Sequence, residues 1–130
     1  MASWTGDESS RIARAEEVEI APRRGDGSLR PRVTVWLVRA GDDLYVRSAV
    51  KGRDAAWYRG VQETHRGRIW ARGKERIEKD VDFVTADPKV NDAVDAAYRS
   101  KYRRYAGRVL DSCLTPDARS TTLRLEPSRQ

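Results

Sequence analysis

Two adjacent runs of β-branched and aromatic residues, joined by a short turn, constrain the fold of this chain more than any other feature. Residues 33–39 and 43–51 flank a glycine- and aspartate-containing turn at residues 40–42. This pattern predicts a β-hairpin. Both faces of the first run are largely apolar, so we expect a central strand that is covered on both sides.

The second strand of this hairpin carries the first candidate for a ligand site. One of its faces should belong to the core, and its other face presents Tyr45, Arg47, Ala49 and Lys51 before the chain reaches Gly52. A phenol, a guanidinium and an ammonium in one row can contact a polar or anionic ligand. The sequence therefore predicts a wall of a binding groove at this position.

Length and the sparse cysteine and histidine content limit the class of protein. A chain of 130 residues is expected to form one domain. A domain of this size buries roughly 65–70% of the surface of its unfolded chain, which is enough to fold without a disulfide or a structural metal. The single cysteine, Cys113, excludes an intramolecular disulfide, and the single histidine, His65, argues against a zinc site. We see neither a secretory signal nor a membrane span, and therefore expect a cytoplasmic protein.

The charge balance is basic. Lysine and arginine together number 26 against 20 acidic residues, which gives a net charge of +6. Such an excess suits an anionic partner: a phosphate-bearing cofactor, an acidic substrate or nucleic acid. Alternatively, the arginines only solvate the surface.

The remaining patterns predict a mainly β (α+β) domain that covers residues 1–130. We expect an N-terminal arm at 1–16 with a short helix, barrel strands within 17–86, a long helix at 87–106 and a final strand at 119–126. A second short helix should follow Asp54, and a tight turn is expected at residues 73–74. Six antiparallel strands joined by tight turns tend to close into a barrel, because closure removes their edges.

A short series of motifs resembles a known group of enzymes. Residues 45–48, Lys51 with Gly52, residues 56–58 and residues 67–69 follow one another in an order similar to the flavin and deazaflavin oxidoreductases of the split β-barrel fold. The whole chain, including residues 23–27 and 96–102, is similar to a bacterial family known as domain of unknown function 2255.

This resemblance implies a split β-barrel, a homodimer and a cofactor groove between the two barrels. It implies that Arg47, Ser48, Lys51 and Gly52 lie along the ring and phosphate of FMN or a deazaflavin. Trp57 and Tyr58 can stack on a planar ligand, or Trp57 can belong to the core, as a tryptophan after a helix cap more often does. At Gly60 and Val61 the chain departs from the asparagine-leucine pair that those oxidoreductases commonly carry. That departure leaves a protein without a cofactor equally open.

Other side chains are candidates for substrate contacts or for acid–base chemistry. Tyr58 and His65 are candidate catalytic residues, since histidine titrates near neutrality, although either can instead be structural. Candidate substrate contacts come from a glycine-rich loop and from the end of the long helix: Arg23, Arg24, Lys101 and Tyr102. These residues can equally shape the loop and solvate the helix end, and Cys113 is expected to be inert.

Three function hypotheses follow. The first is a small enzyme with a flavin- or deazaflavin-type cofactor that oxidises or reduces a small organic molecule. The second keeps the groove but uses no cofactor, with Tyr58, His65, Arg47 or Lys101 doing acid–base chemistry, as in an isomerase or cyclase. The third is nucleic-acid binding through the basic, tyrosine-rich end of the long helix, which is disfavoured because the tyrosines fall on its apolar stripe.

Overall fold

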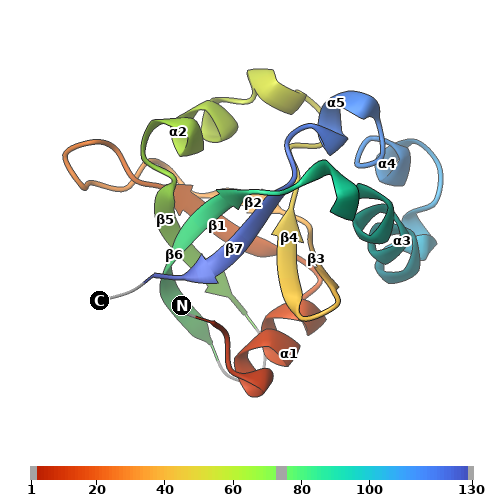
Figure 1. The fold of residues 1–130 in the computed structure, drawn as a ribbon, viewed down its shortest axis with the longest axis horizontal. Helices are drawn as coiled ribbons and strands as arrows, with labels where there is room; N and C mark the ends of the chain where they lie inside the picture. The colour runs from red at the N-terminus through yellow and green to blue at the C-terminus, as the bar shows by residue number, and fades with distance from the viewer. Residues whose placement is uncertain (1–2, 73–75, 129–130) are drawn as a thin grey trace.

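The computed structural model describes residues 3–72 and 76–128, and its central feature is one antiparallel sheet that closes almost completely into a barrel (Figure 1). The sheet has seven strands in the order β2-β1-β5-β6-β7-β4-β3, and each pair of neighbours is antiparallel. The strands are β1 (Val18–Pro22), β2 (Val33–Val35), β3 (Leu37–Ala40), β4 (Asp43–Val46), β5 (Arg66–Ala71), β6 (Ile77–Thr85) and β7 (Leu123–Pro127). The predicted antiparallel barrel is confirmed.

The barrel closes at Trp36. β2 and β3 are the two ends of the strand order, yet only this one residue separates them along the chain. The first run of the hairpin was expected to be one central strand, and the structure divides it in two. β2 pairs with β1 and β3 pairs with β4, so one continuous segment supplies both edges and raises the strand count from six to seven.

Within the described residues, five α-helices and three short 3-10 helices surround the barrel. They are α1 (Gly6–Arg14), η1 (Gly52–Asp54), α2 (Ala56–Thr64), η2 (Pro88–Val90), α3 (Asn91–Lys101), η3 (Arg103–Tyr105), α4 (Arg108–Asp111) and α5 (Pro116–Arg119). The Thr5 side chain caps α1 in a reciprocal capping box with Glu8. The single helix predicted at 87–106 is thus α3 with a 3-10 turn at each end.

Two predicted strands are shorter than expected. The run 43–51 ends as a strand at Val46, because the Ser48 backbone N–H donates to the Thr121 hydroxyl rather than to a neighbouring strand. The final strand was expected to begin at residue 119, but β7 begins at Leu123, since a helix capped by Thr115 occupies the preceding residues. The turn predicted at residues 73–74 lies outside the described residues.

The apolar side chains form two clusters. One fills the barrel and includes Ile20, Ile69 and Phe83, with Ile12 of α1 and Val61 of α2 closing its sides. The second lies outside the barrel wall, between β3, β4 and the helices that follow β6; its buried members are Val38, Tyr45, Val94, Tyr98, Tyr102, Leu110 and Cys113. This second layer positions α3 and α4 beside the end of β4.

Gly67 allows β5 to approach β1 closely, and its replacement tests the barrel. A Cβ atom at this position would lie 2.4 Å from the Ala21 carbonyl oxygen and 2.6 Å from Phe83 Cε2. We expect Gly67→Ala to lower the free energy of unfolding by about 1–3 kcal/mol, the usual cost of overpacking. The matched control is Gly6→Ala, where no atom lies within 4 Å of the added carbon; chemical denaturation of both variants checks the difference, and an equal effect would contradict this packing.

Candidate functional site

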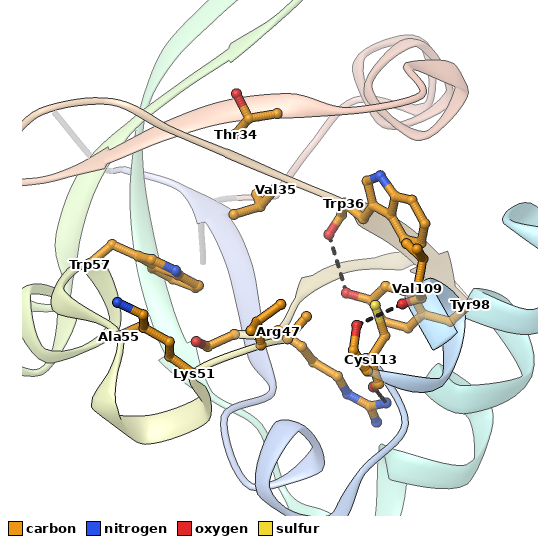
Figure 2. A pocket seen from close by; sticks show the side chains of 14 residues that line it. Thr34, Val35, Trp36, Arg47, Lys51, Ala55, Trp57, Tyr98, Val109 and Cys113 are labelled. Carbon is orange, nitrogen blue, oxygen red and sulfur yellow. Dashed lines mark hydrogen bonds between the residues drawn. The ribbon is translucent and has the colours of Figure 1, made fainter. Parts of the chain in front are cut away.

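A cavity of about 420 Å³ lies where the end of β4 meets β2, the start of α2 and the helices after β6 (Figure 2). Most of its lining is apolar. The lining residues are Thr34, Val35, Trp36, Arg47, Ser48, Ala49, Val50, Lys51, Ala55, Trp57, Tyr98, Val109, Ser112 and Cys113. Its size and composition are typical of small-molecule sites. The predicted wall therefore does border a cavity, and Arg47, Ser48, Lys51 and Trp57 are brought together there.

Aromatic rings border the cavity from two sides. In Figure 2 the Trp57 indole projects into the cavity from one side, and Trp36 and Tyr98 lie on the opposite side. The Tyr98 hydroxyl donates to the Trp36 carbonyl oxygen at 3.2 Å, which fixes the tyrosine. Trp36 also stacks on Tyr102 with a centroid distance of 4.0 Å and an interplanar angle of 5°. Rings held in this way provide flat walls for a planar ligand.

Arg47 turns into the protein instead of offering its charge to the cavity. Its side chain is fully buried, and its guanidinium N–H groups donate to Thr122 Oγ1, the Asp95 carboxylate, the Cys113 carbonyl and both oxygens of Asn91. The ion pair with Asp95 is 2.5 Å long. Since these acceptors match the five donors of a guanidinium, the expected anion site at Arg47 is wrong. Its role is to anchor the segment after β4.

Ser48 and Lys51 are the polar side chains that remain available at the cavity. Ser48 is only 2% exposed, and its hydroxyl has no hydrogen-bond partner among residues 3–72 and 76–128. Lys51 is exposed at the cavity, and its ammonium likewise has no ion-pair partner within the described part of the chain. A hydroxyl and an ammonium that line a cavity without partners in the described chain can both bind a ligand.

Gly52 serves the fold and does not line the cavity. Its φ angle is 52°, and an added Cβ atom would lie 1.6 Å from Asp117 Oδ2 of α5. Glycine is therefore needed because α5 packs against this backbone and because the chain is left-handed here. The expectation that Gly52 lets a ring approach the backbone is not supported by this geometry.

The two candidate catalytic residues lie away from the cavity. Tyr58 packs in the barrel cluster, and burial raises the pKa of its phenol. His65 ends α2 in the left-handed conformation with a φ of 57°, and its Nδ1 lies 3.1 Å from the Phe83 carbonyl oxygen. It borders a separate hollow with Asp82 and Thr85. The structure does not bring Tyr58 and His65 together around one substrate.

The candidate substrate residues of the glycine-rich loop shape that loop. Arg23 pairs with Asp80 at 2.8 Å and donates to the Gly27 carbonyl, while Arg24 donates to the Leu29 carbonyl. None of these residues borders the cavity beside Ser48. The alternative expectation, that they fold the loop, describes them better.

The end of α3 is likewise engaged in packing. Lys101 Nζ donates to the Leu37 carbonyl at 2.5 Å, and burial lowers the pKa of this amine to about 8. Tyr102 is buried, and its hydroxyl donates to the Glu16 carbonyl at 2.6 Å. Burial also raises the pKa of the Tyr102 phenol. Both side chains support the wall behind Trp36 and do not line the cavity.

Sequence reasoning missed Trp36, Tyr98 and Asp95. Trp36 was assigned to one face of a strand, and only the change of pairing partner at this residue places it at the cavity. Asp95 lies within the predicted long helix and was not considered as a site residue, but it is 7% exposed and pairs with Arg47. Asp95 lies four residues after Asn91 and three before Tyr98, so all three share one helix face. The position of Tyr98 on the apolar stripe was therefore the available signal that Asp95 is buried.

Two kinds of structural feature are absent from the described residues. Within residues 3–72 and 76–128, no three histidine, cysteine, aspartate or glutamate residues converge in a way that could hold a metal ion. In the same residues, no helix has the length and apolar character required to cross a bilayer.

Comparisons with known proteins agree with this fold. The family model described as "Uncharacterized protein conserved in bacteria (DUF2255)" matches residues 8–125. A comparison with curated proteins found no relative.

Among solved structures, an F420 reductase is 18% identical, with 93% of each chain covered and a TM-score of 0.56. The heme storage protein HutZ from Vibrio cholerae is 13% identical, with 98% of this chain and 92% of HutZ covered and a TM-score of 0.61. A pyridoxamine 5'-phosphate oxidase-related, FMN-binding protein from Nostoc punctiforme is 14% identical, with 98% and 81% covered and a TM-score of 0.52. At these identities the likeness shows a shared fold.

Proposed function

This chain belongs to the DUF2255 family, and on that premise we propose that it binds a flavin- or deazaflavin-type cofactor in the cavity and oxidises or reduces a small organic molecule. The observation that carries the proposal is the cavity itself. Aromatic rings border it from two sides, and its wall carries the Ser48 hydroxyl and the Lys51 ammonium, neither of which has a partner among residues 3–72 and 76–128. The fold shared with F420- and FMN-binding proteins supports the same assignment.

The residues present fit a planar heterocycle. A volume of about 420 Å³ suits a ring system of three fused rings with part of its side chain. Trp57 would face the ring on one side, with Trp36 on the other. Ser48 Oγ can donate to, or accept from, a ring heteroatom. This donor set suits a flavin better than a heme, because the cavity lining contains no histidine or methionine to act as an axial ligand. Burial raises the pKa of the Cys113 thiol, which disfavours a thiolate ligand, and the Tyr98 hydroxyl is engaged with the Trp36 carbonyl oxygen.

Lys51 is the residue proposed to meet the cofactor's phosphate. With the Arg47 guanidinium saturated by its own chain, Lys51 is the cation at the cavity that has no partner among the described residues. A single exposed ammonium contributes modestly to affinity, by roughly 0.2–1 kcal/mol. We therefore expect the ring to supply most of the binding energy and the phosphate to supply a small preference.

The bound cofactor would supply hydride transfer, and the protein would bind and orient the cofactor. Trp36 and Trp57 exclude water from the ring faces, which protects a reactive hydride. Ser48 orients the ring through one hydrogen bond. The Arg47–Asp95 pair holds the segment that carries Ser48 and Lys51 against α3.

We also propose that two copies of the chain associate at the mouth of this cavity. Val50 is 86% exposed and Val109 is 57% exposed, and both border the cavity. Exposed apolar side chains around a cavity are typical of interaction sites. Replacing Val50 with lysine is expected to shift the mass measured by light scattering from dimer towards monomer; a monomeric unmodified protein would contradict the proposal.

The alternative of acid–base catalysis without a cofactor has less support. It requires groups that exchange protons to converge on one substrate, whereas Tyr58 lies in the barrel cluster and His65 at a different hollow. Nucleic-acid binding requires exposed rings for stacking, but Tyr98 and Tyr102 are each 1% exposed.

Comparing FMN with riboflavin tests both the cavity and Lys51. The unmodified protein should quench the fluorescence of both ligands and bind FMN more tightly. Lys51→Gln should weaken FMN binding by about two- to fivefold and leave riboflavin unchanged. Lys89→Gln is the control, because Lys89 is exposed on η2 and does not line the cavity. Equal losses for both ligands would contradict the phosphate role, and no quenching of FMN or of a deazaflavin would overturn the function.

A further inference from the structure

A compact group of aromatic rings leads from the cavity to the protein surface. Trp36 borders the cavity, and its ring centroid lies 4.0 Å from that of Tyr102 and 5.1 Å from that of Tyr105. Tyr102 and Tyr105 are 6.4 Å apart. Tyr105 is only partly buried. Rings at these separations are in direct contact, so an electron can pass between them without crossing solvent.

The hydroxyl partners distinguish the three tyrosines near Trp36. Tyr98 donates to the Trp36 backbone carbonyl, and Tyr102 donates to the carbonyl oxygens of Glu16 and Leu37. A carbonyl oxygen accepts a hydrogen bond but is too weak a base to take the proton. An oxidised phenol must release its proton. We therefore do not expect a tyrosyl radical to form and remain at Tyr98 or Tyr102.

Tyr105 has a proton acceptor. Its hydroxyl donates to the side-chain carboxylate of Glu16, which also pairs with Arg104. The hydrogen bond from Tyr105 and the guanidinium of Arg104 hold the pKa of Glu16 below its usual range, so the carboxylate is ionised at neutral pH. The Arg104 guanidinium also lies 5.1 Å from the Tyr105 ring, and its positive charge is offset by Glu16.

We propose that Trp36 and Tyr105 form a relay that carries one-electron oxidising equivalents from the cavity to the surface, with Glu16 as the proton acceptor. The inference rests on the proposed function for the source of the oxidant, a photoexcited isoalloxazine, which is reduced by the one electron that it takes. The oxidant takes one electron from the Trp36 indole. The resulting radical cation takes one electron from Tyr105, whose O–H bond breaks as its proton moves to the Glu16 carboxylate.

The products are a neutral tyrosyl radical and a protonated Glu16. A thiol or ascorbate in solution then returns one electron to Tyr105, and Glu16 returns the proton. The relay would protect residues that line the cavity, including the buried thiol of Cys113, from oxidation.

Pulse radiolysis with the azide radical tests the relay in the full-length protein. This oxidant forms in solution and reacts with tryptophan, so the measurement needs no cofactor and is independent of FMN binding. In the unmodified protein we expect tryptophanyl absorption to decay into tyrosyl absorption at a rate independent of protein concentration. Tyr105→Phe should remove most of this phase. Glu16→Gln should slow it while the ring remains in place.

Tyr58→Phe is the matched control, because Tyr58 contacts a different tryptophan, Trp57, at a centroid distance of 6.1 Å. It should leave the fast phase unchanged. Far-ultraviolet circular dichroism checks that each variant is folded. The relay is overturned if the fast phase survives in Tyr105→Phe, or if Tyr58→Phe removes it.

Discussion

Replacing Asp95 with alanine is expected to lower the free energy of unfolding by about 3–5 kcal/mol, because it leaves the buried Arg47 charge without its counter-ion. Arg47 Nη1 lies 2.5 Å from Asp95 Oδ1, and the side chains are 0% and 10% exposed. Chemical denaturation followed by tryptophan fluorescence measures the change.

Asp92 supplies the matched control on the same helix. Its side chain is 96% exposed and pairs with Arg119 at 2.7 Å, so Asp92→Ala is expected to change stability by about 1 kcal/mol or less. The double variant R47M/D95A removes the charge together with its partner and should recover part of the loss. If Asp95→Ala and Asp92→Ala cost the same, Arg47 is not the anchor inferred from the structure.

Replacing Trp57 with alanine is expected to weaken FMN binding by about 1–3 kcal/mol, or about 5- to 150-fold. The indole projects into the cavity opposite Trp36 and Tyr98 (Figure 2), so its removal takes away one flat wall. Fluorescence titration with FMN measures the change in Kd.

Trp57→Phe is the control for this substitution. It keeps an aromatic face, and we expect it to retain most of the affinity. Because Trp57 also packs against the barrel cluster, the thermal midpoint of each variant is measured beside its Kd. Unchanged affinity in a folded Trp57→Ala protein would show that the ring does not bind in this cavity.

Local patterns predicted the antiparallel barrel, since the alternation of residues and the turn chemistry act over a few residues. They could not predict that the run 33–39 divides at Trp36, because which partner each half pairs with is decided by tertiary contacts. In the same way, the strand after residue 43 stops at Val46 because the hydroxyl of Thr121, far along the chain, accepts the backbone N–H of Ser48.

At the site, the resemblance to the split-barrel oxidoreductases implied that Ser48 and Lys51 lie along one ligand, Trp57 was a candidate to stack on it, and all three border the cavity. Arg47 was assigned to the ligand because it shares a strand face with Tyr45 and Lys51 and because the family pattern includes it. The structure buries Arg47 against Asp95, a pairing between residues 48 positions apart. No alternation along a single strand can reveal such a partner.

The most direct test of the cofactor cavity follows the four tryptophan indole N–H signals by ¹⁵N NMR while FMN, and separately a deazaflavin, is added. The signals of Trp36 and Trp57 are predicted to shift with one ligand or the other. Those of Trp4, whose Nε1 donates to the Leu125 carbonyl, and of Trp70, which borders a different hollow, should stay in place. Shifts confined to Trp4 or Trp70, or no shift at saturating concentrations of both ligands, would contradict the assignment.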